Sequence, residues 1–240
     1  MNSMIEPAIQ ELFDNAKKIT FLTGAGVSTP SGIPDYRSKN GLYTSQHTDR
    51  PAEYYLSIDC LRQEPEVFYD FMIHNMYYPD AQPNVIHQRQ SEFTKKRDAM
   101  VITQNIDGLY QKADTKSLVE FHGTLFDVYC LKCGKHVDYH EYLNDMHHEN
   151  CGGILRPNIV LYGEGLNGEN ISRSIAAVST SDLLVVVGTS MKVYPFAGLI
   201  DYRLNSAKVV VVNQEVLDLG FPITMVKTNA TNFFEDLQVN

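Results

Sequence analysis

Four short apolar runs divide the chain, and small or polar residues follow each of them directly. The runs cover residues 19–22, 100–103, 183–187 and 208–212. Continuous apolar runs of this length are typical of strands buried on both faces, so they predict a parallel sheet. The residues that follow them include Gly24, Gln104, Gly188 and Asn213. Because parallel strands present such residues beyond their carboxyl ends, we expect them to meet in one crevice.

Helical spacing is clearest near the start of the chain, where Ile5, Ile9, Leu12 and Phe13 share one face of a helix predicted over 5–18. A second helix is predicted over 66–76, and a third directly after the glycine-rich turn at Gly24. The pattern therefore predicts an α/β fold: a Rossmann-like parallel sheet with helices on both faces.

Two stretches interrupt the alternation of strands and helices and predict a smaller lobe. Residues 39–85 are rich in Tyr, Pro and charge, and residues 127–156 hold three of the four cysteines. We therefore assign 1–38, 86–126 and 157–240 to a large, nucleotide-binding type of domain. The helical insertion 39–85 and the cysteine module 127–156 would together form the small domain.

Composition narrows the choice of partners. The chain has 240 residues and a net charge of −9, so a nucleic-acid partner is not expected. Its apolar runs are far shorter than the roughly 20 residues of a membrane helix, and residues 1–18 lack the pattern of a secretion signal. We expect no membrane partner and a cytoplasmic location, where clustered cysteines hold metal more often than disulfides.

The glycine-rich segment 24–37, GAGVSTPSGIPDYR, carries the most information. Glycines let backbone amides approach a pyrophosphate, although a bare G-x-G also occurs in turns that bind nothing. The whole segment closely resembles the sirtuin family motif GAG(I/V)S-x-x-SGIPDFR. Four further segments resemble family motifs in the family's order: TQNIDGL at 103–109, FHG at 121–123, GTS-x-x-V-x-P at 188–195, and the Asn that ends VVN at 211–213.

The resemblance implies NAD-dependent removal of an acyl group from a protein lysine, with NAD consumed as a co-substrate. The products would be nicotinamide, free lysine and O-acyl-ADP-ribose. His122 would be the general base, a role that the usual histidine pKa of about 6.5 permits. Asn105 would act beside it in catalysis, holding a ribose hydroxyl or a water molecule.

The remaining contacts to NAD are also implied by the family pattern. Ile106 and Asp107 would hold the nicotinamide carboxamide. The other residues expected to contact NAD are Gly24, Ala25, Gly26, Thr29, Tyr36, Arg37, Gln104, Gly188, Thr189, Ser190 and Asn213. Two positions depart from the family, because Tyr36 replaces its usual Phe and Tyr110 its usual His.

Cys130-x-x-Cys133 is half of a common tetrahedral zinc site, and Cys151 follows 18 residues after Cys133. The family usually has a cysteine where His148 stands. We expect a structural Zn²⁺ bound by Cys130, Cys133, His148 and Cys151, with His147 or His136 as alternatives to His148.

Residues 159–164, IVLYGE, resemble the family's strand that pairs with an acyl-lysine protein or peptide. Val160, Tyr162, Gly163 and Glu164 are therefore expected to bind this substrate. A family branch that removes acidic acyl groups has a Tyr and, three residues later, an Arg. Here Tyr69 is the nearest match, and Met72 stands where the Arg would be. We therefore expect neutral acyl groups, with acetyl first.

Three other functions share parts of this pattern. They are mono-ADP-ribosyl transfer to a protein, a noncatalytic module that binds NAD or ADP-ribose, and hydride transfer by a dehydrogenase. Asn105, Asp107 and His122 are all present, which favours deacylation over these alternatives.

Overall fold

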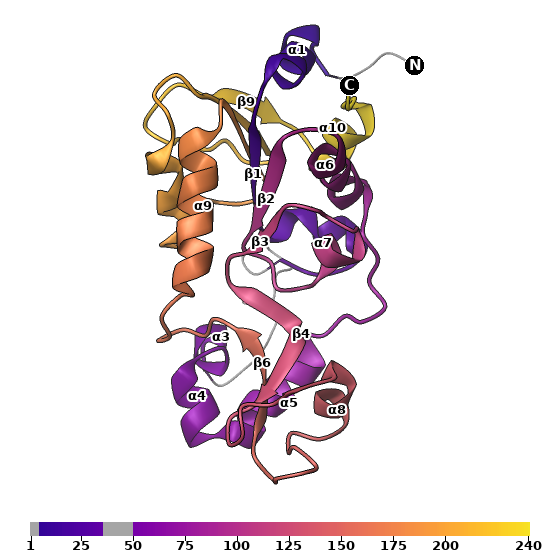
Figure 1. The fold of residues 1–240 in the computed structure, drawn as a ribbon, viewed down its shortest axis with the longest axis vertical. Helices are drawn as coiled ribbons and strands as arrows, with labels where there is room; N and C mark the ends of the chain where they lie inside the picture. Colours follow the sequence, from indigo (N-terminus) through magenta and orange to yellow (C-terminus); the bar gives the residue numbers. More distant parts are fainter. Residues whose placement is uncertain (1–4, 36–49) are drawn as a thin grey trace.

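A six-stranded parallel sheet forms the centre of the computed structural model, which describes residues 5–35 and 50–240 (Figure 1). Its strands, in spatial order, are β3 (Leu118–Glu120), β2 (Ala99–Thr103), β1 (Ile19–Thr23), β7 (Leu183–Val187), β8 (Lys208–Asn213) and β9 (Thr224–Lys227). All neighbouring pairs run parallel. The α/β fold class and the four central strands are therefore confirmed. The apolar runs did not predict β3 and β9, the two edge strands.

Successive residues of each strand enter two different cores, which explains the uninterrupted apolar runs. On β1, Phe21 packs in one core and its neighbour Leu22 in the other. The first core is covered by α1 (Pro7–Asn15), α6 (Val85–Lys96) and α10 (Ala230–Asp236). The second lies under α9 (Gly168–Thr180) and the 3₁₀ helix η3 (Phe196–Tyr202). Figure 1 shows α9 on the opposite side of the sheet from α6 and α10. A strand between two helical layers can be apolar at every position.

The prediction of a helix directly after the glycine-rich turn is wrong. Two 3₁₀ turns stand there instead, η1 (Ala25–Val27) and η2 (Thr29–Ser31). Pro30 lies at the start of η2 and removes a backbone donor, and Gly32 then adopts φ +85°, which ends the helical path. The chain therefore stays close to the carboxyl end of the sheet.

A second, smaller layer packs below the main sheet (Figure 1). The antiparallel strands β4 (Gly123–Cys130), β5 (His136–Val137) and β6 (Leu155–Ile159) form it, in the order β5-β4-β6. The helices around it are α3 (Ala52–Tyr55), α4 (Ile58–Gln63), α5 (Pro65–Asn75) and α8 (Tyr139–Asn144); the one-turn α7 (Leu109–Lys112) follows β2. One apolar core joins the two insertions, because Cys60 and Met72 pack in the same cluster as Val128 and Leu155.

Within residues 5–35 and 50–240, the structure has no helix with the length and apolarity needed to cross a bilayer.

Candidate active site

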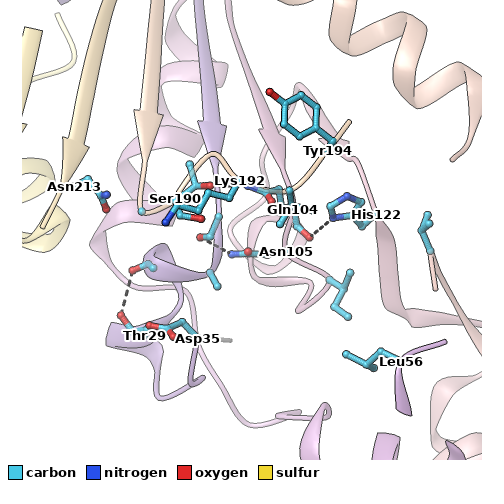
Figure 2. Close-up of a pocket in the computed structure, with 18 of the residues that line it drawn as sticks. Thr29, Asp35, Leu56, Gln104, Asn105, His122, Ser190, Lys192, Tyr194 and Asn213 are labelled. Carbon is cyan, nitrogen blue, oxygen red and sulfur yellow. Dashed lines mark hydrogen bonds between the residues drawn. The ribbon is translucent and has the colours of Figure 1, made fainter. Parts of the chain in front are cut away.

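A cleft of about 860 Å³ opens at the carboxyl ends of the central strands. Residues at or just beyond the ends of β1, β2, β7 and β8 all line it, as the sequence predicted: Gly24, Gln104, Gly188 and Asn213. Figure 2 shows Asn213 and His122 on opposite sides of this cleft, with Ser190 and Gln104 between them. Its volume lies within the usual range of small-molecule sites, so the cleft is large enough for a dinucleotide-sized ligand and part of a second substrate.

Two glycine-containing loops touch at the base of the cleft. The amide of Gly26 donates to the carbonyl oxygen of Gly188 at 2.9 Å. A Cβ atom on Gly26 would lie 2.8 Å from that oxygen, and one on Gly24 would lie 2.7 Å from the Cβ of Thr189. Gln104 adds a side-chain bond across the loops, because its Nε2 donates to Thr189 Oγ1 at 2.8 Å. The glycines are therefore required by the contact between loops as well as by any phosphate.

A chain of buried polar groups lies behind this floor. The Nδ2 of Asn105 donates to Ser28 Oγ at 3.0 Å and to the Gly24 carbonyl at 3.1 Å. The Ser28 hydroxyl donates in turn to Asp107 Oδ2 at 2.6 Å, and the Leu109 amide donates to Asp107 Oδ1 at 3.0 Å. Burial raises the pKa of Asp107, while these two donors oppose that rise. Asp107 also lines a smaller adjoining cavity that it shares with Ile106.

The imidazole of His122 is oriented by a backbone carbonyl. Its Nδ1 lies 3.2 Å from the backbone carbonyl oxygen of Gln104. A dashed line marks this contact in Figure 2. Because a carbonyl oxygen only accepts, Nδ1 carries the proton and Nε2 keeps its lone pair. Burial lowers the pKa of His122, so the ring is neutral near pH 7. This side chain lines the cleft and is suited to take a proton.

The backbone conformation at position 123 explains why a glycine follows this histidine. Its φ is +80°, in the left-handed region. A Cβ atom there would lie 2.0 Å from the carbonyl oxygen of Asn158 on β6. The close approach lets the Val160 amide donate to the His122 carbonyl at 2.9 Å, so the histidine is fixed to the segment after β6.

The segment after β6 forms one wall of the cleft. Val160, Tyr162, Gly163 and Glu164 all line it, and 42% of the Tyr162 surface is exposed. Tyr162 pairs with the helical insertion, since its amide donates to Leu56 and its carbonyl accepts from Ile58. The Glu164 carboxylate is partly buried, and both of its oxygens accept hydrogen bonds from the guanidinium of Arg156.

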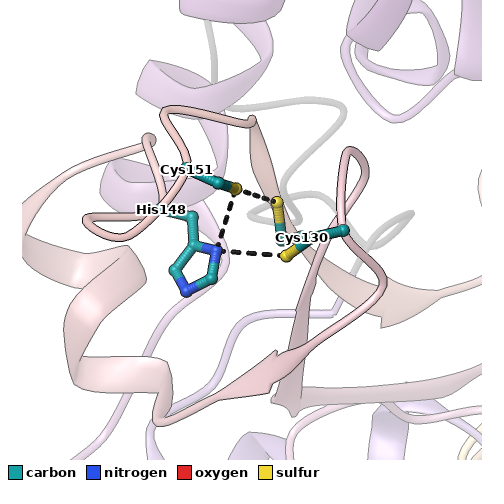
Figure 3. A group of neighbouring side chains, drawn as sticks. Cys130, His148 and Cys151 are labelled. Carbon is teal, nitrogen blue, oxygen red and sulfur yellow. Dashed lines mark hydrogen bonds between the residues drawn. The ribbon is translucent and has the colours of Figure 1, made fainter.

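The zinc ligands predicted from the sequence come together in the small lobe (Figure 3). One donor atom from each of Cys130, Cys133, His148 and Cys151 lies within 4.8 Å of the others. His148 Nδ1 is 3.3 Å from Cys133 Sγ and 3.2 Å from Cys151 Sγ, and Cys130 Sγ is 3.5 Å from Cys151 Sγ. A tetrahedral site with Zn–S bonds of about 2.3 Å and a Zn–N bond of about 2.0–2.1 Å has edges of roughly 3.5–3.8 Å. The three separations are within about 0.4 Å of these edges, so the donor set fits zinc.

Neighbouring residues support this assignment. A Cβ atom on Gly153 would lie 2.6 Å from Cys130 Sγ, so a glycine is needed beside the cluster. The alternative ligands are engaged elsewhere, because His147 contacts Asp145 and His136 contacts Asp127. Four protein ligands leave no open position for a reacting water, as is typical of a structural metal.

Apart from the zinc ligands, the predicted site residues that the structure describes lie around the two cavities. Asp107 lines the smaller cavity, and the other described ones line the large cleft: Gly24, Ala25, Gly26, Thr29, Gln104, Asn105, Ile106, His122, Val160, Tyr162, Gly163, Glu164, Gly188, Thr189, Ser190 and Asn213. Tyr36 and Arg37 lie outside the described residues. Sequence reasoning missed Ser28 and Glu215, although Ser28 stands inside the glycine motif and Glu215 follows Asn213 by two positions.

Comparison with known proteins agrees with this geometry. The model of the Sir2 family matches residues 24–195. A protein of Lactiplantibacillus plantarum named NAD-dependent protein deacetylase is 56% identical over 232 residues, which cover 97% of this chain and 98% of that protein. A Listeria monocytogenes protein of the same name is 49% identical and covers 95% of this chain and 99% of its own length. The chain belongs to the Sir2 family, the sirtuins.

Solved structures are similar over nearly the whole chain. A Sir2 complex with a p53 peptide and NAD⁺ has a TM-score of 0.84 at 32% identity and covers 97% of this chain and 96% of its own. Sir2Tm bound to a propionylated peptide has a TM-score of 0.81 at 31% identity and covers 95% of this chain and 94% of its own.

Proposed function

We propose that this chain is an NAD-dependent protein-lysine deacetylase. The observation that carries the proposal is the placement of His122 in a cleft built from two glycine loops, with its Nδ1 held by the Gln104 carbonyl. This contact directs the lone pair to Nε2, and burial lowers the pKa of the ring. Relatives named as NAD-dependent protein deacetylases, and Sir2 structures with NAD⁺ and peptides, support it.

We assign NAD as co-substrate to the glycine-loop half of the cleft. Backbone amides of the loop at Gly24 and the side chains of Thr189 and Ser190 would contact the phosphates. Asn213 would contact the adenosine half, and Ile106 and Asp107 would hold the nicotinamide carboxamide. Because the Asp107 carboxylate is buried, it accepts a hydrogen bond from an amide strongly.

The peptide would lie along residues 160–164 and direct its acyl-lysine toward His122. In the reaction the C1′–nicotinamide bond breaks and the acyl oxygen bonds to C1′. His122 Nε2 then takes the proton of a ribose hydroxyl whose oxygen attacks the imidate carbon. Asn105 would hold that hydroxyl or a water molecule, because its amide is fixed by Ser28 and Gly24. The lysine amine then leaves with the proton that His122 had taken. A water molecule adds to the acyl carbon in its place, and the acyl oxygen stays on C1′ as a hydroxyl, so the product is O-acyl-ADP-ribose.

The environment of Met72 supports neutral acyl groups. Met72 is fully buried in the apolar core of the small lobe, and the hydroxyl of Tyr69 lies 3.4 Å from the Leu143 carbonyl. An acidic acyl chain directed toward this core would bury an unpaired carboxylate, which costs several kcal/mol. We therefore expect acetyl-lysine to be turned over faster than succinyl-lysine.

We further propose the division into a large domain (1–38, 86–126, 157–240) and a small domain (39–85, 127–156), with the peptide wall at their junction. The shared core of the two insertions supports it. A cytoplasmic location is supported by the four cysteines, none of which forms a disulfide and three of which sit in the zinc cluster.

The test is to incubate the zinc-loaded protein with NAD and an acetyl-lysine peptide and to follow all products by mass spectrometry. We expect equal amounts of deacetylated peptide, nicotinamide and O-acetyl-ADP-ribose. His122→Ala should abolish all three, whereas His74→Ala, at an exposed histidine, should not. ADP-ribose on protein with the peptide unchanged would replace the proposal with a transferase. NAD binding without turnover would replace it with a binding module, and NADH formation with a dehydrogenase.

A further inference from the structure

The wall of the cleft that faces the peptide has little regular structure of its own. Between β6 and α9, residues 160–167 form a connection without a helix or strand (Figure 1). In the described part of the chain, the amides of Gly163 and Gly165 donate no main-chain hydrogen bond. Open main-chain donors beside a cleft suit an added peptide strand, which needs them in register. Something else must therefore hold this segment in shape.

A buried ion pair supplies that restraint. Arg156 on β6 donates Nη1 to Glu164 Oε1 at 2.6 Å and Nη2 to Glu164 Oε2 at 3.1 Å. Only 3% of the Arg156 side chain and 23% of the Glu164 side chain are exposed. Two parallel bonds to one carboxylate fix orientation as well as distance.

Both partners also bind the backbone of the same connection. Arg156 Nη2 donates to the Ile159 carbonyl at 2.6 Å, and the Leu161 amide donates to Glu164 Oε2 at 2.9 Å. The Glu164 amide donates to the Leu161 carbonyl at 3.0 Å and closes a turn in which Gly163 adopts φ +89°. The pair thus sets the backbone path on both sides of Tyr162.

We propose that Arg156 is a positioning residue for the protein substrate: through Glu164 it holds the peptide-binding wall in register. Glu164 therefore acts through the wall and makes no contact of its own with the peptide side chains. The inference rests on the proposed function. It differs from a general stabilising role because, within residues 5–35 and 50–240, no side-chain hydrogen bond of Arg156 or Glu164 goes to the glycine loops, Asn105 or Asp107.

The test compares two acetylated substrates. A peptide with flanking residues uses the wall, whereas a blocked acetyl-lysine without flanks uses mainly the channel to His122. Glu164→Gln should raise the KM of the peptide roughly 10- to 100-fold, the range that a displaced binding element produces. It should leave the KM of the short substrate and the Kd of NAD within about twofold.

Two further variants complete the experiment. Glu92→Gln weakens a more exposed ion pair on α6, in which Arg89 Nη1 lies 2.7 Å from Glu92 Oε2. It should change the KM of neither substrate. Arg156→Lys keeps a charge beside Glu164 but loses the paired bonds, so it should also weaken the peptide selectively if Glu164→Gln does not fold. A wild-type ratio between the two substrates in a folded Arg156 or Glu164 variant would overturn the proposal. So would a parallel loss of NAD affinity. A wild-type protein that turns over neither substrate would instead refute the proposed function.

Discussion

Gly123→Ala is the sharpest perturbation that the active site offers. The new methyl group would stand 2.0 Å from the Asn158 carbonyl oxygen, whereas real Cβ atoms essentially never come closer than 3.0 Å to such an atom. The strands β4 and β6 must therefore separate by about 1 Å at this point. Because Val160 is bonded to the His122 carbonyl across the same gap, the separation displaces the histidine.

The magnitude follows from two contributions. A left-handed alanine costs about 1–2 kcal/mol, and overpacking adds about 1–3 kcal/mol, so we expect a loss of about 2–5 kcal/mol in the free energy of unfolding. Displacement of a catalytic group by 1 Å lowers kcat/KM about 100-fold. Gly220→Ala is the matched control, because Gly220 has φ +75° but no heavy atom within 4 Å of its added Cβ. It should lose only about 1–2 kcal/mol and keep its activity.

The assay is denaturant unfolding of both variants together with kcat/KM for an acetyl-lysine peptide. The difference between the two variants isolates the clash from the backbone strain that they share. Equal losses of stability with activity retained in Gly123→Ala would refute the reasoning that β4 must approach Asn158.

Three further predictions concern histidines. Burial lowers the pKa of His122, and only the neutral ring accepts a proton. The acid limb of the kcat/KM–pH profile should therefore report a pKa below the usual histidine value of about 6.5. A limb with a pKa above about 6.5 would contradict this. His148→Ala should lower zinc content from one ion per chain to near zero, measured with a chelating dye, while His147→Ala keeps its zinc; the reverse result would reassign the ligand. Burial lowers the pKa of His87 to about 3. Between pH 6.5 and 3 the unfolded chain therefore binds a proton that the folded chain does not bind. The stability that the neutral His87 contributes is present above pH 6.5 and is lost as the pH falls. The loss is up to about 1.4 kcal/mol per pH unit between 6.5 and 3; His87→Gln should flatten that part of the unfolding free energy–pH curve, and an unchanged slope would show that other groups cause it.

The central sheet was predictable because strands covered on both faces leave a plain signal. Residues 183–187 are apolar without interruption and form β7 over that same range. The edge strand β9 has partly exposed positions and therefore no comparable run. The predicted helix at 5–18 shortened to Pro7–Asn15, since Pro7 starts it and Ala16 already adopts an extended conformation.

The chemistry of the site was predictable where it depends on residue type and spacing within one motif. Cys130-x-x-Cys133 and the histidine of the FHG segment are of this kind. What the sequence could not provide were the contacts between distant segments. Nothing in residues 121–123 indicates that Asn158 lies against Gly123, and nothing around Glu164 indicates that its partner is Arg156. Such contacts depend on register across strands, which local patterns do not encode.

The contact between Gly26 and Gly188 also restricts how this chain can change over time. A side chain at either position would collide with the backbone of the other loop, so neither glycine can be replaced while the other loop keeps its path. Two segments more than 160 residues apart in the sequence must therefore be kept together or changed together. A designer who transplants the first loop from another nucleotide-binding protein has to transplant the second with it.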